Sequence, residues 1–264
     1  MHAFHFGSAR RRLFGLYHQP AATGKPVAGV VLCAPFGHEY IRSHRALRNL
    51  AVRLSEAGLH VLKFDYFGCG DSAGGNGDGS VAQWQEDIGA ALDELKDMTG
   101  LAAVSLVGLR FGATLAALAI ARRSDVRTLV LWDPVLRGGP YVDELRALQA
   151  DWLQTRPRVS GVTPPAPDAE LIGFPLPPAL HDEFKAIDLL ASTRWRARRV
   201  VTMATQDVDV EALPRHLDAL GVRNEFEQVA ADCAWQRPAS VHLQLQAPAV
   251  IARVAAILEP GAGA

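Results

Sequence analysis

The sequence predicts an α/β protein with a mostly parallel central sheet, helices on both faces and an inserted lid. Short apolar runs rich in β-branched residues alternate with longer helix-forming runs, as in VSLVG followed by FGATLAALA. Such alternation places parallel strands between crossover helices. The length of 264 residues suits one large domain with an insertion, and a hydrophobic content of 49% suffices for its core.

The predicted elements follow one another in a strand–helix repeat. Strands are expected at residues 11–19, 27–37, 60–68, 104–108, 128–135, 199–207 and 224–231. Helices are expected at residues 44–58, 84–95, 111–119, 141–153, 210–221 and 248–258. In the first helix, Leu47, Leu50 and Leu54 recur at helical spacing, so one apolar face can pack on the sheet.

The repeat breaks between Pro134 and Ser192, where prolines gather in TPPAPD and FPLPP. A structureless loop of this length would be unusual in a compact domain, and it contains one credible helix, YVDELRALQADWL. We therefore expect a core formed by 1–135 and 193–264, with 136–192 inserted as a lid over the carboxyl edge of the sheet. Its apolar lining is expected to include Trp152, Leu153 and Phe174.

Composition excludes several classes of protein. A net charge of −1 gives no sign of nucleic acid or an anionic membrane as partner. The 3 cysteines are scattered and cannot all pair, which favours a reduced, cytoplasmic setting. No secretory signal and no apolar run long enough to span a membrane are evident. The 9 histidines form no metal-binding motif, so neither a metal nor a cofactor is expected.

The stretch GLRFG, at residues 108–112, has the frame of a nucleophile elbow, with a strand before it and a helix after it. Serine would be expected at the centre, because its hydroxyl can lose a proton and form an acyl ester. Arg110 stands there instead. A guanidinium stays protonated and is no nucleophile, so acyl-enzyme chemistry at this position is excluded.

Four features of the chain resemble the α/β-hydrolase superfamily: VVLCAPFGHEY, GLHVLKFDYFGCGDSAG, VSLVGLRFGATLA and the cap between the strands at Trp132 and Val200. The first resembles the strand and loop that supply one oxyanion-hole amide. More closely, PFGHEYIRSHRALRNLA, FDYFGCGDSAG, GLRFGATLA and CAWQRP are similar to a bacterial subgroup related to the exosortase-A-associated hydrolases. The resemblance implies an α/β-hydrolase fold whose site lies at the elbow.

The resemblance also implies positions for a catalytic acid and a catalytic histidine. The acid should follow a late strand, which favours Asp207, with Asp133 and Asp209 as alternatives. The histidine should lie between the last strand and the last helix, where His242 is available, although its surroundings lack the expected Gly-His pair. A position on a loop surface is the alternative for His242.

Further site residues are expected around the elbow. Gly37 and Phe111 would supply backbone amides, and Glu39 would face the pocket mouth. His38 is a candidate acid–base group, with a hydrogen bond that shapes the loop as its alternative.

Two more residues are expected to contact the substrate. Trp152 would do so from the lid, and Cys69 from the glycine-rich loop. Cys69 is also a candidate for a replacement nucleophile, because a nearby His38 or Arg110 could lower the pKa of its thiol. Ser72, in the same loop, is expected to be structural.

Arg110 allows two interpretations. It can bind a carboxylate or phosphate in the pocket, beside the N-terminus of the following helix. It can instead fold back onto an acid such as Asp65, Asp71 or Asp133.

Three functions remain open. One is an enzyme acting on an acyl ester or thioester at a serine-less site. Another is a pseudo-enzyme that binds an acidic or acyl ligand. The third is a cyclase or lyase, which needs a base but no serine. In each case the expected partner is a small-molecule or carrier-bound acyl compound, and a homodimer stays open.

Overall fold

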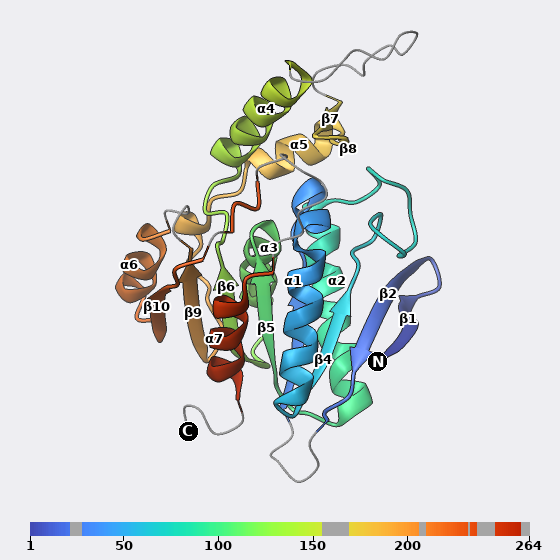
Figure 1. Cartoon of the computed structure of the whole chain (residues 1–264), viewed down its shortest axis with the longest axis vertical. Helices are drawn as coiled ribbons and strands as arrows, with labels where there is room; N and C mark the ends of the chain where they lie inside the picture. The colour runs from blue at the N-terminus through green and yellow to red at the C-terminus, as the bar shows by residue number, and fades with distance from the viewer. Residues whose placement is uncertain (22–27, 155–168, 206–209, 232, 237–245, 260–264) are drawn as a thin grey trace.

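The computed structural model describes the chain apart from residues 22–27, 155–168, 206–209, 232, 237–245 and 260–264. Its main sheet runs in the order β1-β2-β4-β3-β5-β6-β9-β10 (Figure 1). The strands are β1 (His2–Ser8), β2 (Arg11–His18), β3 (Ala28–Cys33), β4 (Leu59–Phe64), β5 (Val104–Leu109), β6 (Val126–Trp132), β9 (Arg199–Ala204) and β10 (Asn224–Gln228).

The sheet is mostly parallel, as predicted. Strand β2 is antiparallel to both β1 and β4, whereas all pairings from β4 through β3, β5, β6 and β9 to β10 are parallel. The carboxyl ends of the parallel strands therefore meet at one edge, where α/β proteins place their sites.

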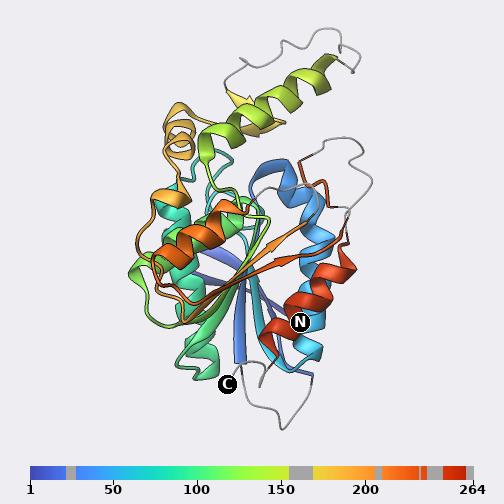
Figure 2. The same cartoon turned by 90° about the vertical axis from the view of Figure 1, so that its left-hand side faces the viewer.

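Helices cover both faces of the sheet (Figure 2). Their bounds are α1 (Gly37–Glu56), α2 (Val81–Thr99), α3 (Phe111–Ala119), α4 (Gly138–Gln154), α5 (Pro178–Lys185), α6 (Ala212–Ala219) and α7 (Pro248–Leu258). Helices α1 and α7 pack on one face, and α2, α3 and α6 pack on the other, each over its own apolar core. None of the helices in the described ranges is both long and apolar enough to cross a membrane.

Helix α5 and a short hairpin within 136–192 were not predicted, and two elements outside that segment also differ from the prediction. Strand β1 was not expected, because most of its side chains are exposed and its apolar alternation is limited to Phe4 and Phe6. Helix α1 begins at Gly37, seven residues before the predicted start at His44. Gly37 has φ 63°, a left-handed conformation that favours glycine. Phe36 is the N-cap, so Gly37 is the first residue of the helix. His38 and Glu39 consequently lie on a helix and not in a loop.

The segment 136–192 contains α4, α5 and a hairpin of β7 (Glu170–Leu171) and β8 (Phe174–Pro175). Figures 1 and 2 show these elements together at one end of the molecule. Phe184 of α5 packs against Phe36 and Phe111, which follow the carboxyl ends of β3 and β5. Trp152 is half-buried and Leu153 is 53% exposed, so Leu153 does not contribute the apolar lining expected of it.

Candidate functional site

Arg110 occupies the sharp turn between β5 and α3. Its backbone has φ 52° and ψ −123°, a strained conformation for a residue with a side chain. A Cβ on Gly108 would lie 2.3 Å from the Ala113 Cα, and one on Gly112 would lie 2.2 Å from the Ala34 carbonyl oxygen. Both glycines are therefore required for the close packing of helix and strands, with or without catalysis.

The Arg110 side chain forms a buried ion pair with Glu39. Its Nε donates to Glu39 Oε1 at 3.1 Å, and the Tyr141 hydroxyl donates to Glu39 Oε2 at 3.2 Å. Arg110 is 5% exposed and Glu39 is fully buried. Burial alone would lower the pKa of Arg110, but Glu39, Tyr141 and Glu144 hold that pKa above its usual value. Arg110 thus folds back onto an acid, which was one of its two interpretations, but the acid is Glu39 on the first turn of α1 and not Asp65, Asp71 or Asp133.

The rest of the guanidinium faces a cleft. Nη2 lies 4.0 Å from Glu144 Oε2, beyond hydrogen-bond distance, and within the described ranges neither Nη group makes a hydrogen bond. The cleft has a volume of about 380 Å³ and we call it the Arg110 cleft. Its lining residues are Arg110, Pro134, Val135, Leu136, Arg137, Pro140, Tyr141, Glu144, Leu190, Ala212 and Gln236.

Asp133, which follows β6, is fully buried, and both of its carboxylate oxygens accept hydrogen bonds. Oδ1 accepts from the Thr205 backbone N–H at 2.7 Å, and Oδ2 accepts from Trp235 Nε1 at 2.9 Å and Thr205 Oγ1 at 3.1 Å. Burial raises the pKa of Asp133, and these donors oppose the rise. The donors to Asp133 are therefore an indole, a hydroxyl and a backbone amide. Asp207, Asp209 and His242 lie outside the described residues.

His38 is buried and is not among the residues that line the Arg110 cleft. It is 8% exposed, and its Nε2 lies 3.0 Å from the backbone carbonyl oxygen of Gln236. Because a carbonyl only accepts, Nε2 carries the proton. Burial lowers the pKa of His38, so the ring is neutral at pH 7. Its hydrogen bond joins α1 to the segment that carries Gln236.

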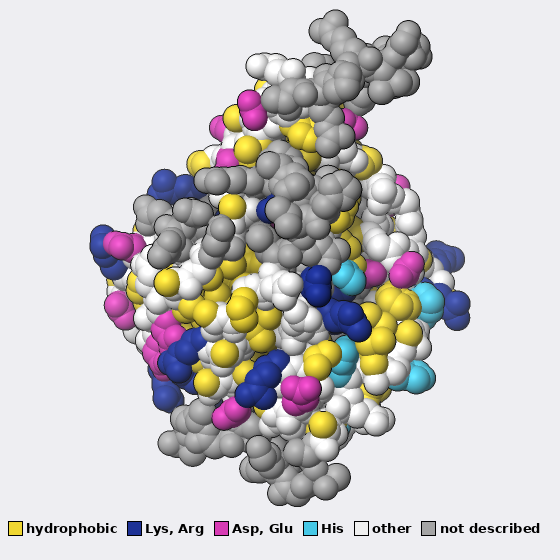
Figure 3. All heavy atoms as spheres, viewed as in Figure 1, with side chains coloured by type: hydrophobic (Ala, Val, Ile, Leu, Met, Phe, Trp, Pro, Cys, Tyr) yellow, Lys and Arg dark blue, Asp and Glu magenta, His cyan; other side chains and the backbone are white. Residues whose placement is uncertain are grey.

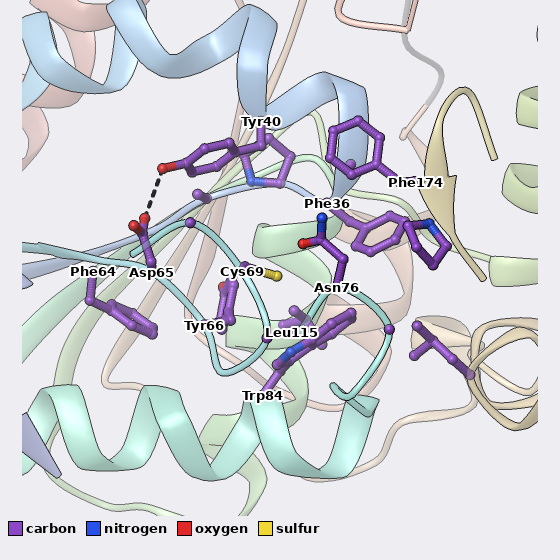
Figure 4. A pocket seen from close by; sticks show the side chains of 18 residues that line it. Phe36, Tyr40, Phe64, Asp65, Tyr66, Cys69, Asn76, Trp84, Leu115 and Phe174 are labelled. Atoms are coloured by element: carbon purple, nitrogen blue, oxygen red, sulfur yellow. Dashed lines mark hydrogen bonds between the residues drawn. The ribbon is translucent and has the colours of Figure 1, made fainter. Parts of the chain in front are cut away.

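A second, apolar cavity lies beside the elbow (Figure 4). It has a volume of about 60 Å³ and we call it the apolar cavity. It is lined mainly by Ala34, Pro35, Phe36, Gly37, Tyr40, Phe64, Asp65, Tyr66, Gly68, Cys69, Gly70, Asn76, Gly77, Trp84, Leu115, Phe174, Pro175 and Leu180. A chain of rings from Phe36 through Phe184 and Phe111 to Tyr141 links this cavity to the Arg110 cleft.

Several predicted site residues belong to the apolar cavity or to the packing around it. Gly37 and Cys69 line it, whereas Phe111 is fully buried. Burial raises the pKa of the Cys69 thiol to about 12, which contradicts a role as thiolate nucleophile. Ser72 Oγ donates to the Asp65 carbonyl oxygen at 2.5 Å and accepts from the Phe14 N–H at 2.8 Å, the structural role expected of it. Trp152 is not among the residues that line either cavity.

Sequence reasoning missed the roles of Glu144, Gln236 and Trp235. Glu144 lies three residues beyond Tyr141 on α4, so the helical spacing of YVDELRALQADWL could have placed the two residues side by side. Gln236 and Trp235 lie within CAWQRP, which resembled a family motif but carries none of the usual catalytic residue types.

Comparisons with known proteins agree with this architecture. Residues 24–169 match the family described as serine aminopeptidase, S33, and the chain belongs to this α/β-hydrolase family. No curated protein sequence matches significantly.

Solved structures with the same fold include several esterases and hydrolases. One is Est1E from Butyrivibrio proteoclasticus with ferulic acid bound, at 16% identity over 96% of each chain with a TM-score of 0.65. An esterase of Pyrococcus furiosus has 16% identity over 88% of this chain and 81% of its own, with a TM-score of 0.61. A putative hydrolase from Agrobacterium vitis has 22% identity over 98% of each chain, with a TM-score of 0.55. These similarities confirm the predicted α/β-hydrolase fold.

Proposed function

We propose that this α/β-hydrolase binds a small acidic or acyl ligand in the Arg110 cleft and does not form an acyl-enzyme. The observation that carries the proposal is the buried ion pair of Arg110 and Glu39 at the nucleophile position. A guanidinium held by a carboxylate keeps its proton and cannot attack a carbonyl carbon. It can still hold a ligand oxygen with the donors that remain.

The surroundings of Arg110 support binding rather than acyl transfer. Acyl transfer needs a base that takes the proton of a nucleophile, and an acid that orients this base. Asp133 instead holds the indole of Trp235 and the hydroxyl of Thr205. The elbow thus keeps its backbone frame, while the side chains around it have taken other partners.

The Arg110 cleft suits a small ligand. Its volume of about 380 Å³ is within the usual range for such sites, about 300–1,000 Å³. Apolar groups such as Leu136 and Leu190 form part of its wall, which suits an acyl portion, free or carrier-bound. The segment 136–192 supplies α4 and much of this wall, so we assign it the role of a lid. The sequence motifs that resemble exosortase-A-associated hydrolases lead us to include a role in biosynthesis in the proposal.

The test is the binding of a carboxylate to the wild type and to Arg110→Lys. Lysine keeps a positive charge for Glu39 but loses the Nη fork, so folding is retained while ligand contacts are lost. We expect a carboxylate such as 4-methylpentanoate or N-acetylleucine to bind the wild type. Calorimetry should show that its affinity for the variant is at least about 10-fold lower. Equal affinity for both proteins would make Arg110 purely structural.

A second candidate function is serine-independent turnover of an acyl ester or thioester, or a cyclase or lyase reaction. The observation that favours it is the neutral imidazole of His38, which could act as a base through Nδ1 while Nε2 donates to Gln236. Turnover of acyl thioesters by the wild type, lost in His38→Gln, would establish it. Absence of turnover in both proteins leaves the binding proposal.

A further inference from the structure

We propose that the ligand of the Arg110 cleft is an α-amino carboxylate, meaning a carboxylate with an N–H group on the neighbouring carbon. The inference rests on the proposed function, because it specifies the ligand of that same cleft. It follows from the polar groups that the cleft leaves without partners and from the charges around them.

The first such group is the Arg110 guanidinium. A guanidinium carries five N–H donors, and within the described ranges the Nε donor alone is used, on Glu39. The remaining donors face the cleft, where a ligand can contact them. Buried polar groups normally have a partner, and a planar fork of donors is best matched by a carboxylate.

The second group is an acceptor on the same cleft. The side-chain oxygen Oε1 of Gln236 is buried and has no hydrogen-bond partner within the described part of the chain. Gln236 lines the Arg110 cleft together with Glu144, whose carboxylate is 44% exposed. Glu144 and Gln236, which line the same cleft as the guanidinium, are both acceptors and call for a ligand that also donates.

The charges lead to the same conclusion. Arg110 and Arg137 are the cationic side chains lining the cleft, but Glu39 pairs with Arg110 and Glu144 lies 4.0 Å from its Nη2. Asp188 lies 3.8 Å from Nε of Arg137. A ligand with only negative charge would therefore meet carboxylates as well as guanidinium groups. A ligand with its own donor turns Glu144 from a repulsive neighbour into a partner.

The spacing of these groups fits the ligand. In an α-amino carboxylate, the nitrogen and the nearer carboxylate oxygen are roughly 3 Å apart, as standard bond lengths dictate. The 4.0 Å between Arg110 Nη2 and Glu144 Oε2 allows one such ligand to contact both. Leu136 and Leu190, on the same cleft, would contact its apolar side chain.

Two sources share this chemistry. A free amino acid would place its ammonium on Glu144, whereas an N-acylated amino acid would donate its amide N–H to Gln236. The experiment compares three ligands of one skeleton: leucine, N-acetylleucine and 4-methylpentanoate, which lacks the nitrogen. We expect one of the first two to bind at least about 10-fold more tightly than 4-methylpentanoate, by calorimetry.

Variants then assign the source. If leucine is preferred, Glu144→Gln should abolish the preference; if N-acetylleucine is preferred, Gln236→Leu should do so. Asp143→Asn, an exposed neighbour of Glu144 on α4, is the matched control and should change nothing. Each variant is first checked for an unchanged melting temperature, and the three-ligand comparison on the wild type stands without them.

The outcomes separate this inference from the proposed function. If 4-methylpentanoate binds as tightly as both nitrogen-containing ligands and its binding weakens in Arg110→Lys, the inference is overturned and the proposed function stands. A preference for leucine or N-acetylleucine that survives both Glu144→Gln and Gln236→Leu also overturns it. If all three ligands bind the wild type and Arg110→Lys with equal affinity, both the inference and the proposed function are overturned.

Discussion

The two cavities beside the elbow differ in how their polar groups are used. In the apolar cavity, Tyr40 donates to Asp65 Oδ1 at 2.8 Å, and the Asp71 N–H donates to Oδ2 at 3.1 Å. The Trp84 indole donates to the carbonyl oxygen of Phe67 at 3.0 Å. Figure 4 shows the bond between Tyr40 and Asp65 at the edge of this cavity. The Tyr66 hydroxyl is the exception in the apolar cavity, because it is buried and has no hydrogen-bond partner among the described residues. In the Arg110 cleft, the Nη groups and Gln236 Oε1 have no such partners within the described residues.

The difference indicates which polar groups of the site still need a hydrogen-bond partner from outside the protein. Polar groups that bond one another hold a fold together, and a ligand gains little from them. Groups left open in a buried cleft are costly to the folded protein unless a ligand or water satisfies them. The surface elsewhere carries both acidic and basic side chains, as Figure 3 shows for one face, so overall charge does not select the ligand.

The largest expected effect is at the ion pair itself. Glu39→Gln removes the charge that balances Arg110 and leaves a buried guanidinium uncompensated. We expect the free energy of unfolding to fall by about 3–5 kcal/mol, measured by urea denaturation. Glu144→Gln is the control, because its partly exposed carboxylate should contribute at most about 1 kcal/mol. Similar losses in both variants would mean that Arg110 is not held chiefly by Glu39.

A smaller effect is expected beside the apolar cavity. Ser72→Ala leaves the Phe14 N–H and the Asp65 carbonyl oxygen without their side-chain partner, at a cost of about 1–3 kcal/mol. Ligand binding in the Arg110 cleft should not change, since Ser72 is not among its lining residues. The exposed Ser124→Ala is the matched control. If Ser72→Ala weakened ligand binding but not stability, the two cavities could not be treated as separate.

The smallest effect concerns pH and His38. Burial lowers the pKa of His38 in the folded state, whereas the unfolded value is about 6.5. The folded state therefore keeps its full stability above pH 6.5 and loses part of it as pH falls through the lowered pKa. Each unit of pKa difference removes about 1.4 kcal/mol. Urea denaturation at pH 7.5 and 5 should show a smaller loss for His38→Gln than for the wild type, while the exposed His5→Gln should match the wild type.

The fold could be predicted from the sequence because the apolar periodicity of the core elements is strong. Strand β1 was not predicted, because its side chains are mostly exposed. The early start of α1 was not predicted, because it depends on Gly37 adopting a left-handed φ. For the site, the arginine at position 110 was visible in the sequence, and the prediction that no serine mechanism operates at that position rests on it. The partner of Arg110 was not, because Glu39 reaches it only once α1 begins at Gly37. Contacts such as Trp235 with Asp133 join residues far apart in the chain and leave no local pattern.

The measurement that tests the central claim most directly is intact-protein mass spectrometry after treatment with a serine-directed fluorophosphonate. The account predicts no mass increase for the wild type, because a paired guanidinium stands where the nucleophile would be. It predicts none for Arg110→Ser either, since Asp133 already accepts hydrogen bonds from Trp235 and Thr205. A stoichiometric adduct on the wild type would contradict the account by revealing a nucleophile elsewhere. An adduct on Arg110→Ser alone would show that an acid and a base are still placed for acyl transfer.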